Sequence, residues 1–246
     1  MNILWRDVKL TGRRPSYWLT LAAMSFLSGW IALVMTDMAL SQADTAQTLL
    51  DVSVTRKLVL PFFSFFALLS LVLVAVLAGQ LVAAERAAGD LLVLLDNGLG
   101  DARVLMQKLC ALLLLMVPLA LPLAMTLWGW SMAAVLDWQL VGWNLMAWVL
   151  LLLWSASLCL WLSMRITQSG LAALMGLVLL ALLWLMGRPG SGQEWGKNWL
   201  QAFSPRYHFE WLQHGVVPIS SLLFFIGGAG VLYALAVLAL KKARIA

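Results

Sequence analysis

Residues 58–84 read LVLPFFSFFALLSLVLVAVLAGQLVAA and lie between Lys57 and Glu85. The run holds no charged side chain over its whole length. An α-helix needs about 20 predominantly apolar residues to cross the hydrocarbon core of a membrane. Since the run is longer than that, it predicts a transmembrane helix.

Apolar runs on both sides of this segment extend the prediction to the whole chain. Of the 246 residues, 63% are hydrophobic and 11% charged, whereas soluble domains carry about 25% charged residues. The first run follows Arg13 and Arg14 without an A-x-A-like site behind it, so it predicts a membrane helix and no removable signal peptide. The predicted fold is an all-α polytopic membrane protein, a single transmembrane domain over 1–246, with six transmembrane helices at about 17–36, 58–84, 109–135 (interrupted by Pro118 and Pro122), 140–164, 170–187 and 219–240.

The positions of lysine and arginine predict the orientation of the chain. Cytoplasmic loops of membrane proteins carry an excess of these residues. Eleven of the 16 fall in one set of connections, which places both termini in the cytoplasm and the chain in the bacterial inner membrane. The net charge of +5 follows from this bias and indicates no nucleic-acid partner. The majority set is Arg6, Lys9, Arg13, Arg14, Arg86, Arg103, Lys108, Arg165, Lys241, Lys242 and Arg244, and the minority set is Arg56, Lys57, Arg188, Lys197 and Arg206.

Tryptophan and cysteine positions fit a membrane protein. Cys110 and Cys159 both fall inside apolar runs, which is typical of small buried residues rather than of a disulfide or metal pair. Tryptophans near the predicted span ends favour an interfacial belt, with a ligand-binding cluster as the alternative. These tryptophans are Trp18, Trp128, Trp130, Trp138 and Trp143.

The sequence lacks the motifs of an energy source or a catalytic centre. No ionisable residue lies in the middle of a predicted span, so no proton or sodium relay is indicated. The chain has no phosphate-binding P-loop, no H-E-x-x-H and no nucleophile elbow. We therefore predict no catalytic residue, no bound cofactor and no metal in this chain. Another subunit must supply energy, which favours a permease subunit over a membrane enzyme.

A connection on the predicted cytoplasmic side, residues 85–108, reads ERAAGDLLVLLDNGLGDARVLMQK. Leu91–Leu95 form an apolar run too short to cross a membrane, after a possible turn at Gly89. Asp96 is a residue type that favours turns, and Asp101 is a candidate cap for the next helix. An apolar helix in this place must lie on the membrane or dock in a groove of a partner protein, and a plain interfacial loop is the alternative.

The N-terminal residues 2–14 form an amphipathic pattern. Arg6, Lys9 and Arg13 share one helical face, and Trp5 lies beside the opposite, apolar face. This pattern predicts an interfacial helix over 1–16 that lies on the lipid bilayer, with contact to a soluble partner as an addition.

The segment before the last span predicts a short helix at the outer surface. Ser204 and Pro205 are an N-cap and a first-turn proline, and Gly215 is a C-terminal stop. The helix between them, which holds Phe209, is expected at the outer interface or over the fifth and sixth spans. His208 and His214 are six residues apart and do not indicate a metal site. In the last span, Gly227, Gly228 and Gly230 permit close helix contact, within the chain rather than at a dimer face.

These segments resemble type-2 ABC transporter permeases. Family members carry E-R-x-x-G-T-L-x-L-L-L after the second span, a turn, and a basic residue before the third. Glu85, Arg86, Gly89, the run to Leu95, and Lys108 match, while Asp90 replaces the usual Thr and Gly98 the usual Pro. The chain is most similar to the gliding-motility (GldF-like) and nitrous-oxide-reductase maturation (NosY-like) permeases. That likeness rests on Pro15 and Tyr17, on Phe26, Ser28 and Gly29, and on the outer residues Ser204, Pro205, His208, Phe209, Gly215 and Val216.

The resemblance implies a six-helix permease that works as a pair, in a homodimer or with a related second permease. Two cytoplasmic ATPase subunits would bind ATP and Mg, and a periplasmic or membrane-anchored accessory protein would be a further partner. Residues 86–103 would be the coupling helix between spans 2 and 3. Its ATPase-coupling residues would be Glu85, Arg86, Gly89, Leu91, Leu92, Leu94, Leu95, Asp96, Asp101 and Arg103.

Two other functions fit the same residues. An ABC complex of this kind could transmit mechanical work to a periplasmic partner without moving cargo, since the spans offer no polar path. A membrane scaffold or lipid enzyme belongs to another class. It requires polar residues that converge at an interface, and the sequence offers no convincing set.

Overall fold

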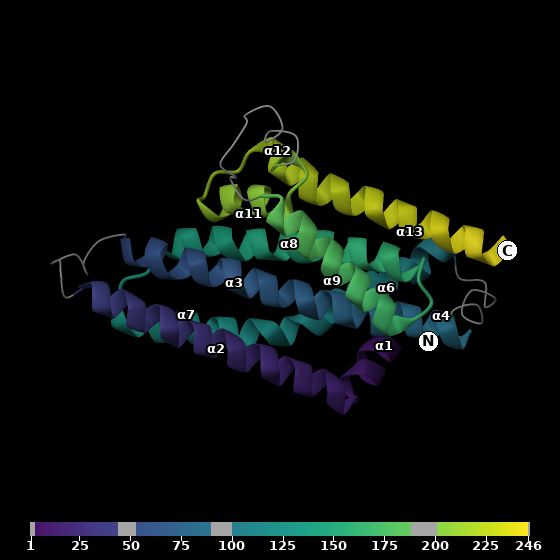
Figure 1. The fold of residues 1–246 in the computed structure, drawn as a ribbon, viewed down its shortest axis with the longest axis horizontal. Coiled ribbons are helices and arrows are strands. Elements are labelled where there is room, and N and C mark those ends of the chain that lie inside the picture. The colour runs from purple at the N-terminus through teal and green to yellow at the C-terminus, as the bar shows by residue number, and fades with distance from the viewer. Residues whose placement is uncertain (1–2, 44–52, 90–99, 188–200, 246) are drawn as a thin grey trace.

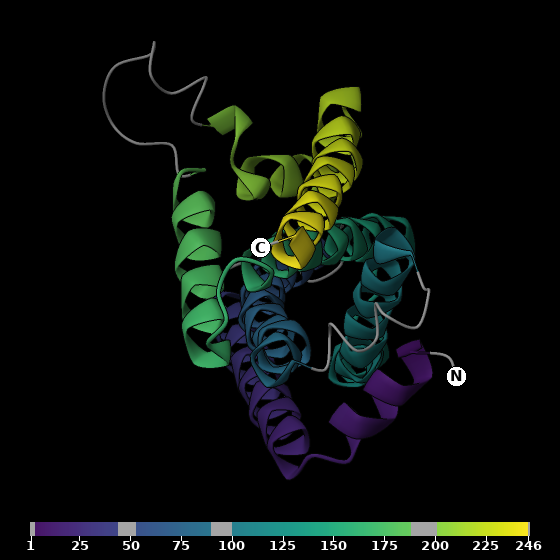
Figure 2. The ribbon, with the colours of Figure 1, turned by 90° about the vertical axis from the view of Figure 1, so that its right-hand side faces the viewer.

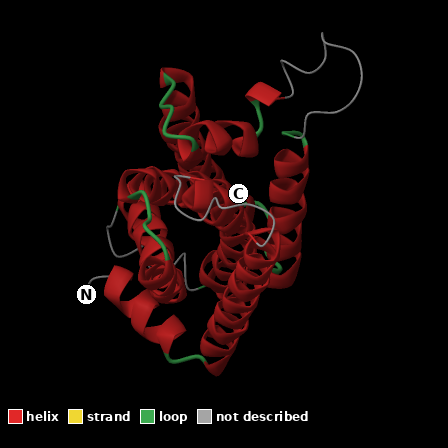
Figure 3. Cartoon of the chain, turned by 90° about the vertical axis from the view of Figure 1, so that its left-hand side faces the viewer, coloured by secondary structure: helices red, strands yellow, loops and turns green. Residues whose placement is uncertain are grey.

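The computed structural model describes residues 3–43, 53–89, 100–187 and 201–245. These parts of the chain are helical and contain no strand (Figures 1 and 3). The prediction of an all-α protein is confirmed for them. In chain order the elements are α1 Ile3–Gly12, α2 Pro15–Ala43, α3 Ser53–Ala78, the π-helical turn η1 Gly79–Ala83, α4 Ala84–Ala88, α6 Asp101–Met116, the 3-10 turn η2 Val117–Leu119, α7 Ala120–Ala133, α8 Trp138–Ser163, α9 Ser169–Leu185, α11 Pro205–Gln213, α12 Ile219–Leu222, the π-helical turn η3 Leu223–Gly227 and α13 Gly228–Ile245.

Five helical stretches are long and apolar enough to cross a membrane. They match five of the six predicted spans, so the chain has the architecture of a multi-pass membrane protein. The predicted span at 170–187 corresponds to α9, which has 17 residues, the lower end of the length that a crossing needs. The five stretches are Pro15–Ala39, Thr55–Ala88, Asp101–Ala133, Trp138–Ser163 and Ile219–Lys242.

Several helices extend beyond their predicted ends. The helical path through α3, η1 and α4 continues to Ala88, and α6 begins at Asp101 instead of near residue 109. The connection between spans 2 and 3 is therefore residues 89–100, shorter than the predicted 85–108. The sequence prediction ended the spans at Glu85 and Lys108 because they carry charge. The tertiary structure pairs both charges, so the helices continue through them.

Two helices form the centre of the bundle. More than half of the membrane-length window is buried in α3 and in α8, against 17% in the outer α2 and Ile219–Lys242. An aromatic row joins α3 to α8 and to α7. Trp130 meets Phe62 edge to face at 5.2 Å, Phe62 lies 5.9 Å from Phe66, and Phe66 lies 5.3 Å from Trp148. Aromatic pairs at these distances add attraction beyond simple burial.

The belt interpretation is wrong for Trp130, which is only 7% exposed. Its indole N–H donates to Thr36 Oγ1 over 2.9 Å and ties α7 to α2. Trp18, Trp128 and Trp138 are exposed on the helix surface. Cys159 is buried, as predicted, whereas Cys110 is half-buried, and both are free thiols.

Proline and glycine act locally in two spans. Pro118 lies in the 3-10 turn η2 that separates α6 from α7, so the predicted interruption of the third span is confirmed there. The prediction is wrong for Pro122, which lies in the first turn of α7, where a proline is tolerated. In the last span only Gly228 permits close contact, because a Cβ there would lie 2.8 Å from Trp154 Nε1 of α8. A Cβ on Gly230 would meet nothing within 4 Å, and one on Gly227 would meet only Leu223 of the same span.

Both ends of the chain lie at the same end of the bundle (Figure 1). The α8–α9 connection and α4 are also there, whereas the α7–α8 connection and α11 lie at the opposite end. Viewed from the end that holds the termini, α1 lies across the base of the bundle between α2 and α6 (Figure 2).

Candidate functional site

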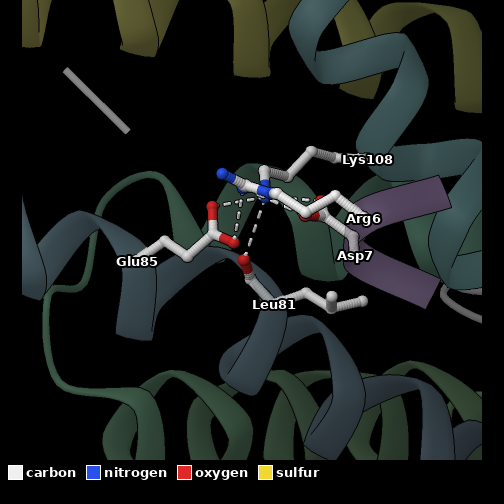
Figure 4. A network of polar contacts seen from close by, with 5 residues as sticks. All are labelled: Arg6, Asp7, Leu81, Glu85 and Lys108. Atoms are coloured by element: carbon white, nitrogen blue, oxygen red, sulfur yellow. Dashed lines mark hydrogen bonds and ion pairs between the residues drawn. The ribbon is translucent and has the colours of Figure 1, made fainter. Parts of the chain in front are cut away.

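Four charged side chains meet where α1, α4 and α6 come together (Figure 4). Arg6 and Asp7 come from α1, Glu85 from α4 and Lys108 from α6. We call these four residues the charge cluster. The two helices that flank residues 89–100 each contribute one member, and the N-terminal helix contributes the other two.

Each carboxylate of the charge cluster bridges both cations. Lys108 Nζ lies 2.7 Å from Asp7 Oδ2 and 2.5 Å from Glu85 Oε2. Arg6 Nη2 lies 3.0 Å from Asp7 Oδ1 and 3.1 Å from Glu85 Oε1. Opposite charges therefore alternate around a closed circuit with no net charge. Short charge-assisted contacts of this kind are the strongest hydrogen bonds in proteins.

Burial makes the charge cluster unusual. The side chains of Lys108 and Asp7 are fully buried, and those of Arg6 and Glu85 are 23% and 18% exposed. A Lys ammonium has three protons to donate. The third goes to the carbonyl oxygen of Leu81, 3.4 Å away in η1. All three donors of the buried ammonium thus have acceptors, which offsets the cost of removing it from water.

The helical spacing of α1 explains how Asp7 reaches the interior. Ile3, Asp7 and Thr11 are buried and follow each other at intervals of four residues, so they form one stripe against α6. The stripe ends at Gly12, whose carbonyl accepts the indole N–H of Trp18 over 2.7 Å. Tyr17 at the start of α2 donates to the carbonyl of Leu115 in α6 over 2.9 Å. The C-terminal end of α1 and the start of α2 are therefore fixed by hydrogen bonds.

The π-helical turn η1 lies between α3 and the charge cluster. A π-helical turn inserts one residue and changes which face the following residues present. Here it precedes Glu85 and holds Leu81, the carbonyl partner of Lys108. Gly79 begins η1 and contacts α9, since a Cβ there would lie 2.6 Å from the carbonyl oxygen of Ser169. The geometry of η1 thus depends on a glycine at this position.

Further contacts connect the flanking helices to the rest of the bundle. Arg86 of α4 donates to the carbonyl of Met164 at the end of α8, where the helix dipole is negative. Tyr233 of α13 donates to the carbonyl of Ala102 in the first turn of α6. These contacts join α4 to the end of α8 and α6 to α13.

A cavity of about 150 Å³ lies beside the charge cluster. Thr11, Arg14, Gln80 and Glu85 contribute its polar lining. Gln80 Oε1 is buried without a hydrogen-bond partner. This space leaves room for side chains to rearrange next to a tightly bonded group.

The predicted coupling residues fall into three groups: those in or next to α4, those in the first turn of α6, and those outside the described residues. Glu85 belongs to the charge cluster, and Arg86 donates to a backbone carbonyl at the C-terminal end of α8. Gly89 ends α4 in a left-handed conformation with φ 79°. Gly100 occupies the N-cap position of α6, so the predicted capping role of Asp101 is wrong, and Asp101 is the first helical residue. Arg103 is exposed. Leu91, Leu92, Leu94, Leu95 and Asp96 lie outside the described residues.

A helix is present in the predicted N-terminal position, as α1. Trp5 is 66% exposed, and Lys9 and Arg13 are exposed as well. The prediction that Arg6 shares a basic face with Lys9 and Arg13 is wrong, because its guanidinium points into the charge cluster. Sequence analysis missed Asp7 and Lys108 as a pair. The available signal was a single acidic residue four positions from Ile3 and Thr11, together with a lysine at the start of an apolar span.

The outer helix α11 has the predicted ends. Ser204 is its N-cap, Pro205 its first residue, and Gly215 follows its end with φ 76°. The Ser204 hydroxyl donates to the carbonyl of Leu183 over 2.9 Å instead of capping its own helix. Phe209 is buried against Trp184 of α9. This confirms that α11 packs over the fifth and sixth predicted spans.

Polar bonds fix α11 to the bundle. His208 Nδ1 lies 2.9 Å from Ser221 Oγ, and its Nε2 lies 3.0 Å from the carbonyl oxygen of Ala202. The side-chain amide of Gln213 donates to the carbonyl of Leu60 over 3.2 Å, and the backbone carbonyl of Gln213 accepts from the Asn144 side chain of α8 over 3.2 Å. Sequence analysis had assigned no role to Asn144 or Gln213.

No protein-family model and no curated protein matches the sequence. Among the described residues, no three His, Cys, Asp or Glu side chains gather in a way that would hold a metal ion.

Proposed function

We propose that this chain is the membrane-spanning permease subunit of a type-2 ABC transporter. Two copies would form the permease in the bacterial inner membrane, and separate cytoplasmic subunits would bind and hydrolyse ATP with Mg. Both termini and residues 89–100 would face the cytoplasm, and α9 would cross the membrane as a sixth span. An accessory periplasmic or membrane-anchored protein would complete the assembly.

The charge cluster is the observation that carries this proposal. It joins the two helices that flank residues 89–100 at 2.5 Å, through Lys108 and Glu85. A force applied to the apolar run Leu91–Leu95 would therefore move α4 and α6 together rather than separate them. Since α4 continues α3 and α6 continues into α7, such a force would reach two spans at once.

Residues 85–95 resemble the coupling segment of type-2 permeases, and this resemblance is the reason for proposing that class of transporter. The chain carries no phosphate-binding loop of its own, so the energy must arrive through a surface contact. A short apolar helix that docks in a groove of a soluble partner is a common form of such contact.

The test is co-purification of an ATPase with the tagged chain from mildly solubilised native membranes. Wild type should bring down a protein with ATPase activity. The pair Leu92→Asp and Leu94→Asp should lose it, because charges cannot enter an apolar groove. Val135→Asp is the matched control, since Val135 is 94% exposed between α7 and α8 and lies at the opposite end of the bundle. An ATPase retained equally by the double variant would reject residues 89–100 as the docking segment. A chain that elutes without ATPase would reject the ABC assignment.

A second candidate is an ABC complex that performs mechanical work on an outer partner without moving cargo. The aromatic row between α3, α7 and α8 favours it, because Phe62 and Phe66 are almost wholly buried in the protomer centre. The hydrogen bonds of α11 to α3 and α8 would carry span movements to the outer surface. ATPase activity that responds to an added periplasmic partner, without substrate, would support this alternative.

A further inference from the structure

The cavity of about 150 Å³ beside the charge cluster is lined by polar side chains that have no partner within the protein. Among the described residues, no hydrogen bond or ion pair joins the side chain of Thr11, Arg14 or Gln80 to another group. Thr11 is nevertheless only 3% exposed, and Gln80 Oε1 is buried. Buried polar groups in folded proteins nearly always have a hydrogen-bond partner. Three unpaired side chains around one space therefore indicate that the partner is a ligand.

The charge of the lining favours an anion. Arg14 and Glu85 are the two charged residues that line the cavity. Both carboxylate oxygens of Glu85 are already paired, one with Lys108 and the other with Arg6. Since the charge cluster as a whole is neutral, the guanidinium of Arg14 is the uncompensated charge of the lining.

The hydrogen-bonding groups of the lining match a phosphate group. The guanidinium of Arg14 carries a planar fork of N–H donors, the Thr11 hydroxyl adds one donor, and the Gln80 amide nitrogen adds two. Arginine binds phosphate through paired, charge-assisted hydrogen bonds. The volume is roughly five times the 30 Å³ that one water molecule takes up in the liquid. This space suits one phosphate group and is too small to enclose a nucleotide.

Small side chains keep the cavity open. Ala84 and Ala88 follow Gln80 at intervals of four residues along η1 and α4, and all three line the cavity. A longer side chain at Ala84 would project into the space that the unpaired groups surround.

The position of the cavity indicates which phosphate would occupy it. Arg14 directly precedes the membrane-length stretch Pro15–Ala39, and Ala88 is the last residue of the stretch Thr55–Ala88. Lipid headgroups lie at this level, just outside the hydrocarbon core. Leu10 also lines the cavity and is 51% exposed, so it offers an apolar surface to the remainder of a lipid molecule.

We infer that this cavity binds the phosphate group of one membrane phospholipid. Arg14 pairs with the phosphate, and Thr11 and Gln80 donate hydrogen bonds to its other oxygens. The inference depends on the membrane location of the bundle and is independent of any ATPase partner.

The test measures lipid binding to the full, delipidated chain in detergent by native mass spectrometry. Phosphatidic acid should bind as a single copy, and diacylglycerol with the same acyl chains, which lacks the phosphate, should bind at least ten-fold more weakly. Equal binding of the two lipids would overturn the inference, because the phosphate would then play no part. Millimolar inorganic phosphate should not displace the phosphatidic acid. Displacement would overturn the choice of a lipid and assign the cavity to free phosphate.

Two arginine variants separate the cavity from the general attraction between basic residues and anionic lipid. Arg14→Gln should weaken the binding of phosphatidic acid at least five-fold. Arg13→Gln removes the same charge from an exposed neighbour that does not line the cavity, and it should keep the wild-type affinity. Equal effects of the two substitutions would overturn the inference, because they would indicate surface attraction only.

A second pair of variants tests the space itself. Ala84→Leu should fill the cavity and weaken the binding of phosphatidic acid at least five-fold. Ala87→Leu is the matched control, since Ala87 is exposed on the same helix and does not line the cavity. Unchanged affinity in a folded Ala84→Leu variant would overturn the inference. Because Arg14 is exposed, Arg14→Gln should keep the fold, so the arginine pair decides the question even where Ala84→Leu does not fold.

Discussion

Lys108 illustrates how a single residue can carry charge inside an apolar bundle. Its ammonium has no solvent exposure and contacts two carboxylates and one carbonyl. Isolated burial of such an ion costs several kcal/mol even after relaxation of the protein. The alternating charges of Arg6, Asp7 and Glu85 offset this cost only while all four members are present.

Removal of the lysine charge should therefore destabilise the protein strongly. Lys108→Met keeps the apolar stem but leaves Asp7 and Glu85 with one cation between them. Breaking a buried pair costs about 3–5 kcal/mol, which corresponds to a fall in Tm on the order of 10 °C for a chain of this size. Thermal unfolding in detergent, followed by tryptophan fluorescence, measures the difference.

Two further variants decide whether charge balance is the cause. Asp7→Asn combined with Lys108→Met leaves the neutral pair of Arg6 and Glu85, so its Tm should lie above that of Lys108→Met alone. Lys9→Met, an exposed lysine on the same helix as Asp7, should keep the wild-type Tm. A double variant less stable than Lys108→Met would contradict the account.

His208 predicts a pH dependence of stability. Burial lowers the pKa of His208, and the hydrogen bond to the Ala202 carbonyl opposes that shift. An unfolded histidine titrates near 6.5, so below about pH 6.5 the unfolded chain binds a proton that the folded chain binds less readily. Stability should be full above that pH and fall as the pH drops.

The measurement is the Tm at pH 7.5 and at pH 5.5. His208→Gln should reduce the difference between the two values by at least half. His214→Gln, at the exposed end of α11, should keep the wild-type difference. If His208→Gln also keeps it, other groups cause the pH dependence.

At the level of elements, the π-helical turn η1 links a span to the charge cluster. Its position is set by Gly79, which brings the backbone of η1 against the start of α9. Since the nearest atom is a backbone oxygen, no side chain can rotate to make room. The exact placement of Glu85 should therefore depend on a residue six positions earlier.

Gly79→Ala should destabilise the protein by about 1–3 kcal/mol, because the added methyl group overpacks the η1–α9 contact. Gly230→Ala is the matched substitution at an open helical position, and it should be neutral or slightly stabilising because alanine favours the helix. The two Tm values in detergent test the pair. Equal values would mean that α9 moves aside at little cost.

At the level of the whole molecule, α9 decides the topology. The helices α8 and α13 both end at the terminus-bearing end of the bundle, so the chain must return to the opposite end between them (Figure 1). α9 makes that return with 17 residues. A tilt or local thinning of the bilayer lets a helix of this length cross.

Labelling of single introduced cysteines tests this topology. Gln168→Cys precedes α9 and should react from the same side of the membrane as tags on both termini. Gln201→Cys follows α9 and should react only from the other side. Reaction of both positions from one side would show that α9 does not cross. The two native cysteines would be replaced by alanine in the background.

The sequence predicted six spans, and five of them are present as helices of membrane length. The sequence was less informative at the charged positions. Apolar run length predicted each long helix, because the cost of burying an unsatisfied backbone in lipid leaves few alternatives. The ends of α11 were predicted, because Ser-Pro and glycine act over one turn. The helix ends at Ala88 and Asp101 were not predicted. They depend on the pairing of Glu85 with a residue 79 positions away and of Lys108 with a residue 101 positions away.

The sequence by itself determined a helical, multi-pass membrane protein, the approximate position of its long helices and the local signals that end α11. Each of these follows from composition or from residues within a few turns of one another. Only the tertiary structure decided that Arg6, Asp7, Glu85 and Lys108 form one neutral group and that Trp130 packs inside. Those features arise from side chains of distant segments, whose meeting depends on how whole helices pack.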